Sequence, residues 1–403
     1  MHRFVAHVTD NPLLELIRLV AEAAGLEHSL MITYLFAMFS IKDRYEHVRG
    51  RVDPNLFMEH RMGGMPEERT DYHHNYLDVC IEEMQHLSQA NGLLGELGAS
   101  PNLNPHQFPL PADIYPFALD FESLNKKVVA KYLWIEADDT ALDPRAHAGN
   151  VPELRFISAV LQELPGASVP NHVGSVYRRI LDCFQESAEK GLLPDRFQYQ
   201  LWFERLHALQ GQGEIAHYNF FKEQFTGVAF GSDETIWNDP QSANYPADEL
   251  FHGTAFDGYS DTIPDESAKR VALLANMHYW ILLILLDAGY RSQDRFIRYK
   301  AIDGMTQCLW HLGMHLARRW KVGLPFDRVG RNYGVGRDRE MTLRIARLYV
   351  EEAQTQMAAL SNDLLLPAGY DRGTLQELRD ALPATGPTLP SGVGWTAYVP
   401  VLE

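Results

Sequence analysis

Apolar residues recur at steps of three and four along most of the chain, and strictly alternating stretches are few. This spacing is typical of amphipathic helices and not of β-strands. Asn11 as a cap, with Pro12 at the first helical position, marks the start of the first helix, and Gly98 with Pro101 marks the end of the second. The pattern predicts an all-α fold. In the first half of the chain it predicts helices over residues 12–41, 75–97, 122–136 and 197–225. A helical pattern also begins again near residue 173, between the third and fourth of these helices.

The remaining segments suggest how the chain is divided. Residues 138–169 contain several prolines and show no clear helical period, so we expect an irregular insertion there. The polar, turn-rich residues 231–264 predict a linker or a wrapping loop. We therefore expect a helical bundle over residues 1–230, this linker, and an additional helical region over residues 265–403. Within that last region the pattern predicts helices over residues 266–289, 293–320 and 337–366, a short helix after residue 374 and an extended tail.

Composition and charge narrow the class of protein. The chain is 46% hydrophobic and 22% charged, as expected for a folded protein, and its formal charge of -17 argues against nucleic-acid or anionic-membrane partners. The most apolar run, residues 271–286, is short and interrupted by Asn276 and His278, which favours a buried helix over a membrane span. The N-terminus has no basic segment followed by an apolar core, and the three cysteines lie far apart. We expect a cytoplasmic protein with free thiols.

Acidic residues occupy positions where the helical pattern requires core residues. Glu27 lies in the same seam of the first helix as Val20 and Tyr34. In the next helix Glu83 and His86 both point toward the core, one turn apart. Burying an isolated carboxylate costs several kcal/mol or forces it to take up a proton. Several such carboxylates in one core therefore predict a shared cation.

The spacing of these residues predicts a dinuclear metal site. Two helices that each give one Glu, with two that each give Glu-x-x-His, form the general di-iron carboxylate arrangement. Carboxylate and imidazole ligands suit iron, and manganese is also possible. We expect two iron ions, and buried but metal-free polar pairs are the alternative. The expected ligands, in chain order, are Glu27, Glu83, His86, Glu136, Glu214 and His217.

Three further side chains are candidates for supporting roles. His28 could bind a metal or a substrate from beside Glu27, but an interhelical hydrogen bond is the favoured explanation. Tyr34 could donate a proton or an electron, or it could be a core tyrosine. His207 shares a seam with Glu214, so we expect it behind the metal ligands.

Four segments of the chain also resemble a known family: LEHSLMITYLFAMFSIKD, IEEMQHL, KYLWIEAD and QGQGEIAHYNFFKEQF. They resemble the ferritin-like family, which also forms part of the iminophenyl-pyruvate dimer synthase group, enzymes that couple two imines of aromatic 2-oxo acids. The resemblance spans about residues 10 to 230. That family often reads Ile-Gly-Glu-x-Tyr where this chain has Val173-Gly174-Ser175-Val176-Tyr177. The resemblance implies that Ser175 stands where a carboxylate is common, beside a second metal site that is weaker or open to substrate.

These observations predict an enzyme. We expect a ferritin-like four-helix bundle acting as a non-haem di-iron oxidase or oxygenase, which uses O2 to oxidise a small organic molecule. The resemblance implies an amino-acid-derived or aromatic metabolite in natural product biosynthesis. The alternatives are an imine-coupling synthase, a manganese catalase, an iron-binding ferroxidase and a metal-free helical scaffold. Exposed apolar seams make a homodimer possible.

Overall fold

The computed structural model describes residues 8–52, 75–109, 115–138, 140–166, 173–195, 197–328, 336 and 338–383. These residues form helices joined by loops, and their β-contacts are isolated bridges such as Phe251–Val322. The all-α prediction is therefore confirmed. The expected extended tail lies outside the described residues.

The first half of the chain forms a four-helix bundle whose third and fourth helices are interrupted. The first two helices are α1 (Pro12–Ser40) and α4 (Tyr76–Glu96), which pack along each other. The third is split into α5 (Lys126–Glu136) and α7 (Val173–Glu189). The fourth consists of α8 (Tyr199–Gln212), the π-helical turn η2 (Gly213–His217) and α9 (Tyr218–Phe225). Short helical turns follow α1 and α9: η1 (Asp43–Tyr45), α2 (Glu46–Arg49), η3 (Val228–Phe230) and η4 (Glu234–Trp237).

Local sequence explains where these helices begin. The Asn11 side chain accepts hydrogen bonds from the backbone of Leu13 and Leu14, so α1 starts where the sequence predicts. Asn75 and Asp78 form a reciprocal capping box at the start of α4. The Asn125 side chain caps α5 by accepting a hydrogen bond from the Val128 backbone, and α5 therefore starts later than the sequence pattern suggests.

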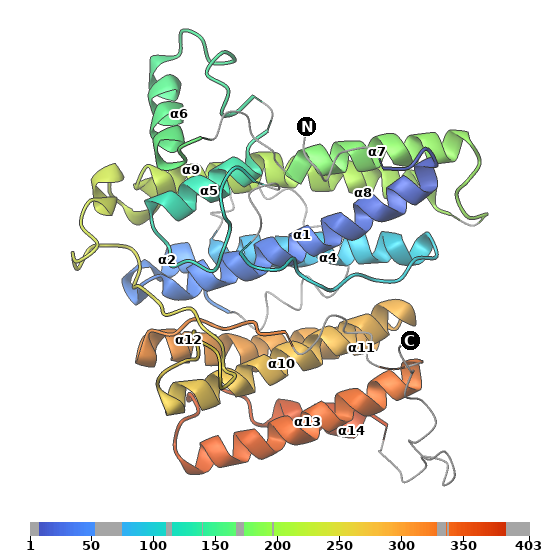
Figure 1. Ribbon diagram of the computed structural model, residues 1–403, viewed down its shortest axis with the longest axis vertical. Coiled ribbons are helices and arrows are strands. Elements are labelled where there is room, and N and C mark those ends of the chain that lie inside the picture. Colours follow the sequence, from blue (N-terminus) through green and yellow to red (C-terminus); the bar gives the residue numbers. More distant parts are fainter. Residues whose placement is uncertain are drawn as a thin grey trace, which may run out of the picture.

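The prediction of an irregular insertion over residues 138–169 is wrong in part. Helix α6 (Val151–Glu163) lies within it, capped by Asn150, and a proline stands in its first turn, where proline is compatible with a helix. Only Ile157 and Val160 of α6 are buried, so its apolar stripe is too narrow to stand out in the sequence. Figure 1 shows α6 projecting from the bundle as an arm.

The additional region is a second group of helices. It comprises α10 (Glu266–Arg291), α11 (Arg295–Gly304), the π-helical turn η5 (Met305–Leu309), α12 (Trp310–Trp320), α13 (Arg339–Asn362) and α14 (Gly373–Ala381). Helix α10 packs against α11, α12 and α13. Within the described part of the chain, α10 alone is long and apolar enough to cross a membrane, but 89% of its most apolar window is buried inside the protein. It is the core helix of this region.

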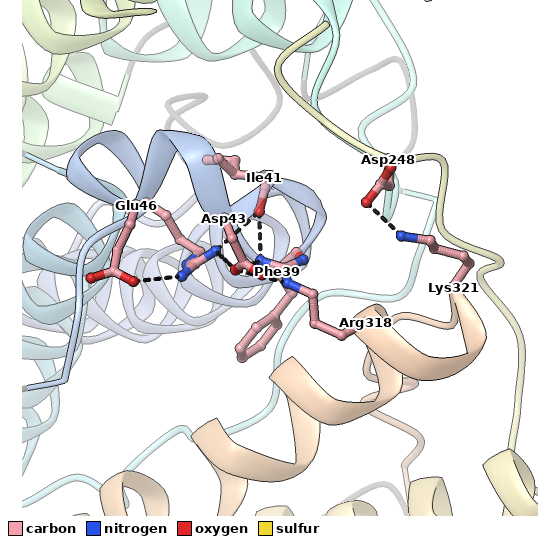
Figure 2. A network of polar contacts seen from close by, with 8 residues as sticks. Phe39, Ile41, Asp43, Glu46, Asp248, Arg318 and Lys321 are labelled. Atoms are coloured by element: carbon pink, nitrogen blue, oxygen red, sulfur yellow. Dashed lines mark hydrogen bonds and ion pairs between the residues drawn. The ribbon is translucent and has the colours of Figure 1, made fainter. Parts of the chain in front are cut away.

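Helices α1 and α4 form a central layer that is covered on both sides. Figure 1 shows α5, α7, α8 and α9 on one side of this layer and α10, α11 and α12 on the other. At the junction, Arg318 of α12 donates to the carbonyl oxygens of Phe39 (3.2 Å) and Ile41 (2.7 Å) at the end of α1 (Figure 2). The linker bridges both parts, since Ala247 pairs with Ile41 and Phe251 with Val322. The additional region is thus packed directly on the bundle.

Candidate metal centre

The bundle core brings together every predicted metal ligand whose side chain is described. Two groups of three donors are formed, and the donor atoms of each group lie within 4.8 Å of one another. Glu83 belongs to both groups, so the groups are adjacent. The side chain of Glu214 lies outside the described residues. The first group is Glu27, Glu83 and His86, and the second is Glu83, Glu136 and His217, all buried.

Each histidine faces two carboxylates through its Nδ1 atom. In His86 this atom lies 3.3 Å from Glu83 Oε2 and 3.6 Å from Glu27 Oε2. In His217 it lies 3.1 Å from Glu83 Oε1 and 3.6 Å from Glu136 Oε2. The two oxygens of Glu83 therefore face different histidines, as a carboxylate shared by two cations requires.

Two unsatisfied atoms show that this donor set fits a pair of metal ions. Glu27 Oε2 and His217 Nδ1 are buried and have no hydrogen-bond partner among the described residues. Leaving such an atom unpaired costs about 1–3 kcal/mol. Both atoms point toward the other donors of their groups, where a cation would satisfy them. Mixed carboxylate and imidazole donors suit iron or manganese.

Without a cation, protons must balance the charges of this cluster. Burial, together with the charge of Glu83, raises the pKa of Glu27 above its ordinary value. Burial alone would also raise the pKa of Glu83, but the nearby rings of His86 and His217 outweigh it and lower that pKa. Burial lowers the pKa values of both histidines, yet the neighbouring carboxylates outweigh it and raise them. Metal binding would displace these protons.

Two tyrosines hold the outer carboxylates of the cluster. Tyr34 donates to Glu136 Oε1 (2.5 Å), and Tyr177 donates to Glu27 Oε1 (2.6 Å). Each carboxylate thus keeps its Oε2 atom toward the other donors. Tyr34 was a sequence candidate, whereas sequence reasoning singled out Ser175 on α7. Ser175 is half-buried, and Tyr177 in the same segment donates a hydrogen bond to the predicted ligand Glu27.

Glu82 is a second residue that sequence reasoning missed. Its Oε2 atom lies 2.6 Å from His217 Nε2, on the side of the imidazole opposite Glu83. A carboxylate in this position orients a metal-binding histidine and makes it a stronger ligand. The only sequence signal was the pair of adjacent glutamates, Glu82 and Glu83.

The two histidines expected near the ligands lie elsewhere. His28 bonds the Leu103 carbonyl oxygen through Nδ1 (2.9 Å) and the Tyr279 hydroxyl through Nε2 (2.8 Å), so it makes the interhelical hydrogen bond considered above. Burial lowers the pKa of His28 to about 3, which keeps its ring neutral. His207 is exposed and packs edge-on against Phe203, not behind the buried ligands. The expected register assumed a continuous α-helix, but the π-helical turn η2 changes the register between His207 and His217.

The fold and the site define a helical bundle with a buried carboxylate–histidine cluster. A family model described as ferritin-like matches residues 20–223, slightly more than half of the chain. The chain therefore belongs to the ferritin-like family. The match includes Glu27, Glu83, His86, Glu136 and His217. No curated protein and no solved structure matches the chain.

Proposed function

We propose that this chain is a non-haem di-iron oxidoreductase that uses O2 to oxidise a small organic molecule. The observation that carries the proposal is the pair of buried donor groups that share Glu83, with donor atoms within 4.8 Å in each group. Membership in the ferritin-like family, whose members commonly bind iron, favours iron over manganese. A bound iron pair supplies the electron-transfer chemistry that dioxygen needs.

The side chains around the cluster have separate tasks in this proposal. Glu27 and His86 would hold one ion, Glu136 and His217 the other, and Glu83 both, with Glu214 as a further ligand. Tyr34 holds a proton at its hydroxyl oxygen, 2.5 Å from Glu136 Oε1. The members of this set whose side chains are described are all buried, and this burial would keep bulk water away from the ions.

The substrate class rests on the sequence alone. The four segments that resemble the iminophenyl-pyruvate dimer synthase group support an aromatic or amino-acid-derived substrate, and coupling of two imines is the second candidate reaction. Ser175 is proposed to lie beside the substrate, in the position where that family has a carboxylate. The charge of -17 supports a small-molecule partner over nucleic acid or an anionic membrane, and we propose a cytoplasmic enzyme, with a homodimer as its assembly.

Metal content tests the proposal directly. Protein purified without added metal, and protein given Fe(II) under anaerobic conditions, would be measured by plasma mass spectrometry, and the optical spectrum would be followed on exposure to O2. We expect about two irons per chain and a spectral change that depends on O2. Glu83→Gln should lose iron, while the exposed Glu204→Gln on the same bundle should retain it. A chain that takes up no iron would overturn the proposal.

A further inference from the structure

The loop that follows α4 crosses α1 at the turn that carries Glu27. Asn102 Nδ2 donates to the Ala21 carbonyl oxygen (2.7 Å), and the His106 backbone donates to Ser29 Oγ (2.8 Å). Gly25 lies beneath this loop, and a Cβ atom there would stand 3.2 Å from the Asn104 carbonyl oxygen. Residues 21–29 of α1 are therefore held in place by this loop on the outside of the bundle and by the bundle core on the inside.

His28 connects this held turn to the additional helical region. It follows Glu27 directly, so the two side chains leave α1 about 100° apart. A carbonyl oxygen can only accept, so His28 Nδ1 donates to Leu103, and Nε2 accepts from the Tyr279 hydroxyl of α10. Both His28 and Tyr279 are buried. The same turn of α1 thus places Glu27 in the cluster and, through His28, is hydrogen-bonded to α10.

We infer that Tyr279 is a positioning residue for the metal centre, which acts through His28 to hold Glu27 in place. The inference rests on the proposed metal-binding function. Without the Tyr279 hydroxyl, His28 Nε2 would be a buried acceptor that has lost its hydrogen-bond donor. A buried acceptor without a donor is costly, so a shift of this turn of α1 that gives His28 a new donor would be favoured. A rotation of this turn would also change the position of Glu27 Oε2 relative to His86 Nδ1, which lies 3.6 Å from it.

This role predicts an unequal effect on the two metal positions. The second donor group takes Glu136 from α5 and His217 from η2, and neither residue belongs to α1. Loss of the Tyr279 hydroxyl should therefore weaken the position that uses Glu27 and leave the other unchanged. A general loss of packing would weaken both.

The test is a titration of metal-free full-length protein with Co(II), followed by calorimetry and by visible absorption. In Tyr279→Phe we expect one Co(II) to bind with wild-type affinity and the other about tenfold to 100-fold more weakly, the range found when a residue that supports a metal ligand is changed. Tyr370→Phe is the matched control. It removes another buried tyrosine–histidine hydrogen bond of the same region, the 2.7 Å contact between Tyr370 and His278, without touching α1. It should bind both ions as the wild type does.

Each result is decisive. The inference is overturned if Tyr279→Phe binds Co(II) at both positions with wild-type affinity, or if its affinity is weakened equally at both. The proposed function is upheld in either case when the wild type binds two ions. Unfolding of Tyr279→Phe but not of Tyr370→Phe, seen in a thermal melt of the metal-free proteins, would also overturn it, because the bond would then support the fold and not Glu27. Failure of the wild type to bind Co(II) would count against the proposed function itself.

Discussion

At the scale of single residues, adjacent glutamates of α4 face opposite nitrogens of one imidazole. Glu83 Oε1 lies 3.1 Å from His217 Nδ1, and Glu82 Oε2 lies 2.6 Å from its Nε2. Because the Nε2 contact fixes the ring, Glu82→Gln should lower metal affinity about tenfold to 100-fold while the fold is retained. The measurement is a Co(II) titration beside a thermal melt, with the exposed Glu204→Gln as control. Unchanged affinity in Glu82→Gln would contradict this role.

Buried His278 predicts how stability depends on pH. Burial lowers its pKa from 6.5 to about 3, so the folded protein keeps this ring neutral while the unfolded chain protonates it below about pH 6.5. The unfolded state then binds more protons at this residue, so the contribution of His278 to stability falls as pH drops below this value, by at most about 1.4 kcal/mol per pH unit. His278→Gln should flatten this fall in urea unfolding between about pH 7 and about pH 5. The exposed His207→Gln should leave the slope unchanged, and an equally steep fall in His278→Gln would contradict the assignment.

Sequence reasoning found the cluster because its members break the apolar pattern at core positions. Glu27, Glu83 and His86 each stand where the helical period requires an apolar residue, and each is buried as expected. Glu82 and Tyr177 could not be found in this way. Their partners are His217 and Glu27, 135 and 150 residues away in the chain, and only the packing of helices brings each pair together.

At the scale of helices, Arg318 of α12 acts as a cap for α1. It donates to two carbonyl oxygens at the end of α1 and to Asp43 Oδ1 (3.0 Å), as Figure 2 shows. Burial tends to raise the pKa of Asp43, but hydrogen bonds from Arg49 and Arg318 outweigh it and lower that pKa. Arg318→Met should reduce the free energy of unfolding by about 1–3 kcal/mol, since partly buried carbonyl groups lose their donor. Urea unfolding measures this loss.

Arg319 provides the control for that measurement. It is the next residue of α12, it is exposed, and its guanidinium group stacks on Trp320. Arg319→Met should change the free energy of unfolding by less than about 0.5 kcal/mol. Equal effects of the two substitutions would show that charge, and not the capping of α1, explains the result.

Helix boundaries were predicted well where capping residues mark them and poorly where backbone geometry changes within a helix. Asn11, Pro12 and Asn75 gave the starts of α1 and α4 to within a residue. The π-helical turns η2 and η5 were missed, because one extra residue in a turn leaves the run of apolar and polar residues almost unchanged. This is also why His207 was expected on the wrong face of its helix.

At the scale of the whole molecule, the helices before residue 230 pack against those after residue 265, through the contacts of α1 with α12 and of α4 with α10. A Cβ atom at Gly313 of α12 would stand 2.6 Å from the ring of Phe39 on α1, so the two helices touch at this point. Leu35 and Phe39 of α1 line a shared apolar space with Leu309 and Trp310 of the additional region. The apolar pattern predicts the helices of each group. It does not predict the contact between the groups, because that contact depends on which face of α1 each group covers.

A fragment that ends at residue 230 should therefore fail to fold as a stable bundle. It would expose Phe36 and Phe39, which are buried in the full chain, and each such side chain contributes about 1.5–3 kcal/mol through burial. It would also lose the two hydrogen bonds that Arg318 donates to carbonyl oxygens at the end of α1. We expect aggregation or a non-cooperative melt, measured by size-exclusion chromatography and thermal unfolding.

The control is the full chain cut at a protease site placed in the exposed residues 238–241 of the linker. It has a similar break but keeps both groups of helices, so it should stay associated and melt cooperatively. A fragment of residues 1–230 that is monomeric, melts cooperatively and binds two Co(II) ions would show that the bundle is an independent domain. In that case α10 could not be needed to position Glu27, because the fragment would hold that carboxylate in place without Tyr279.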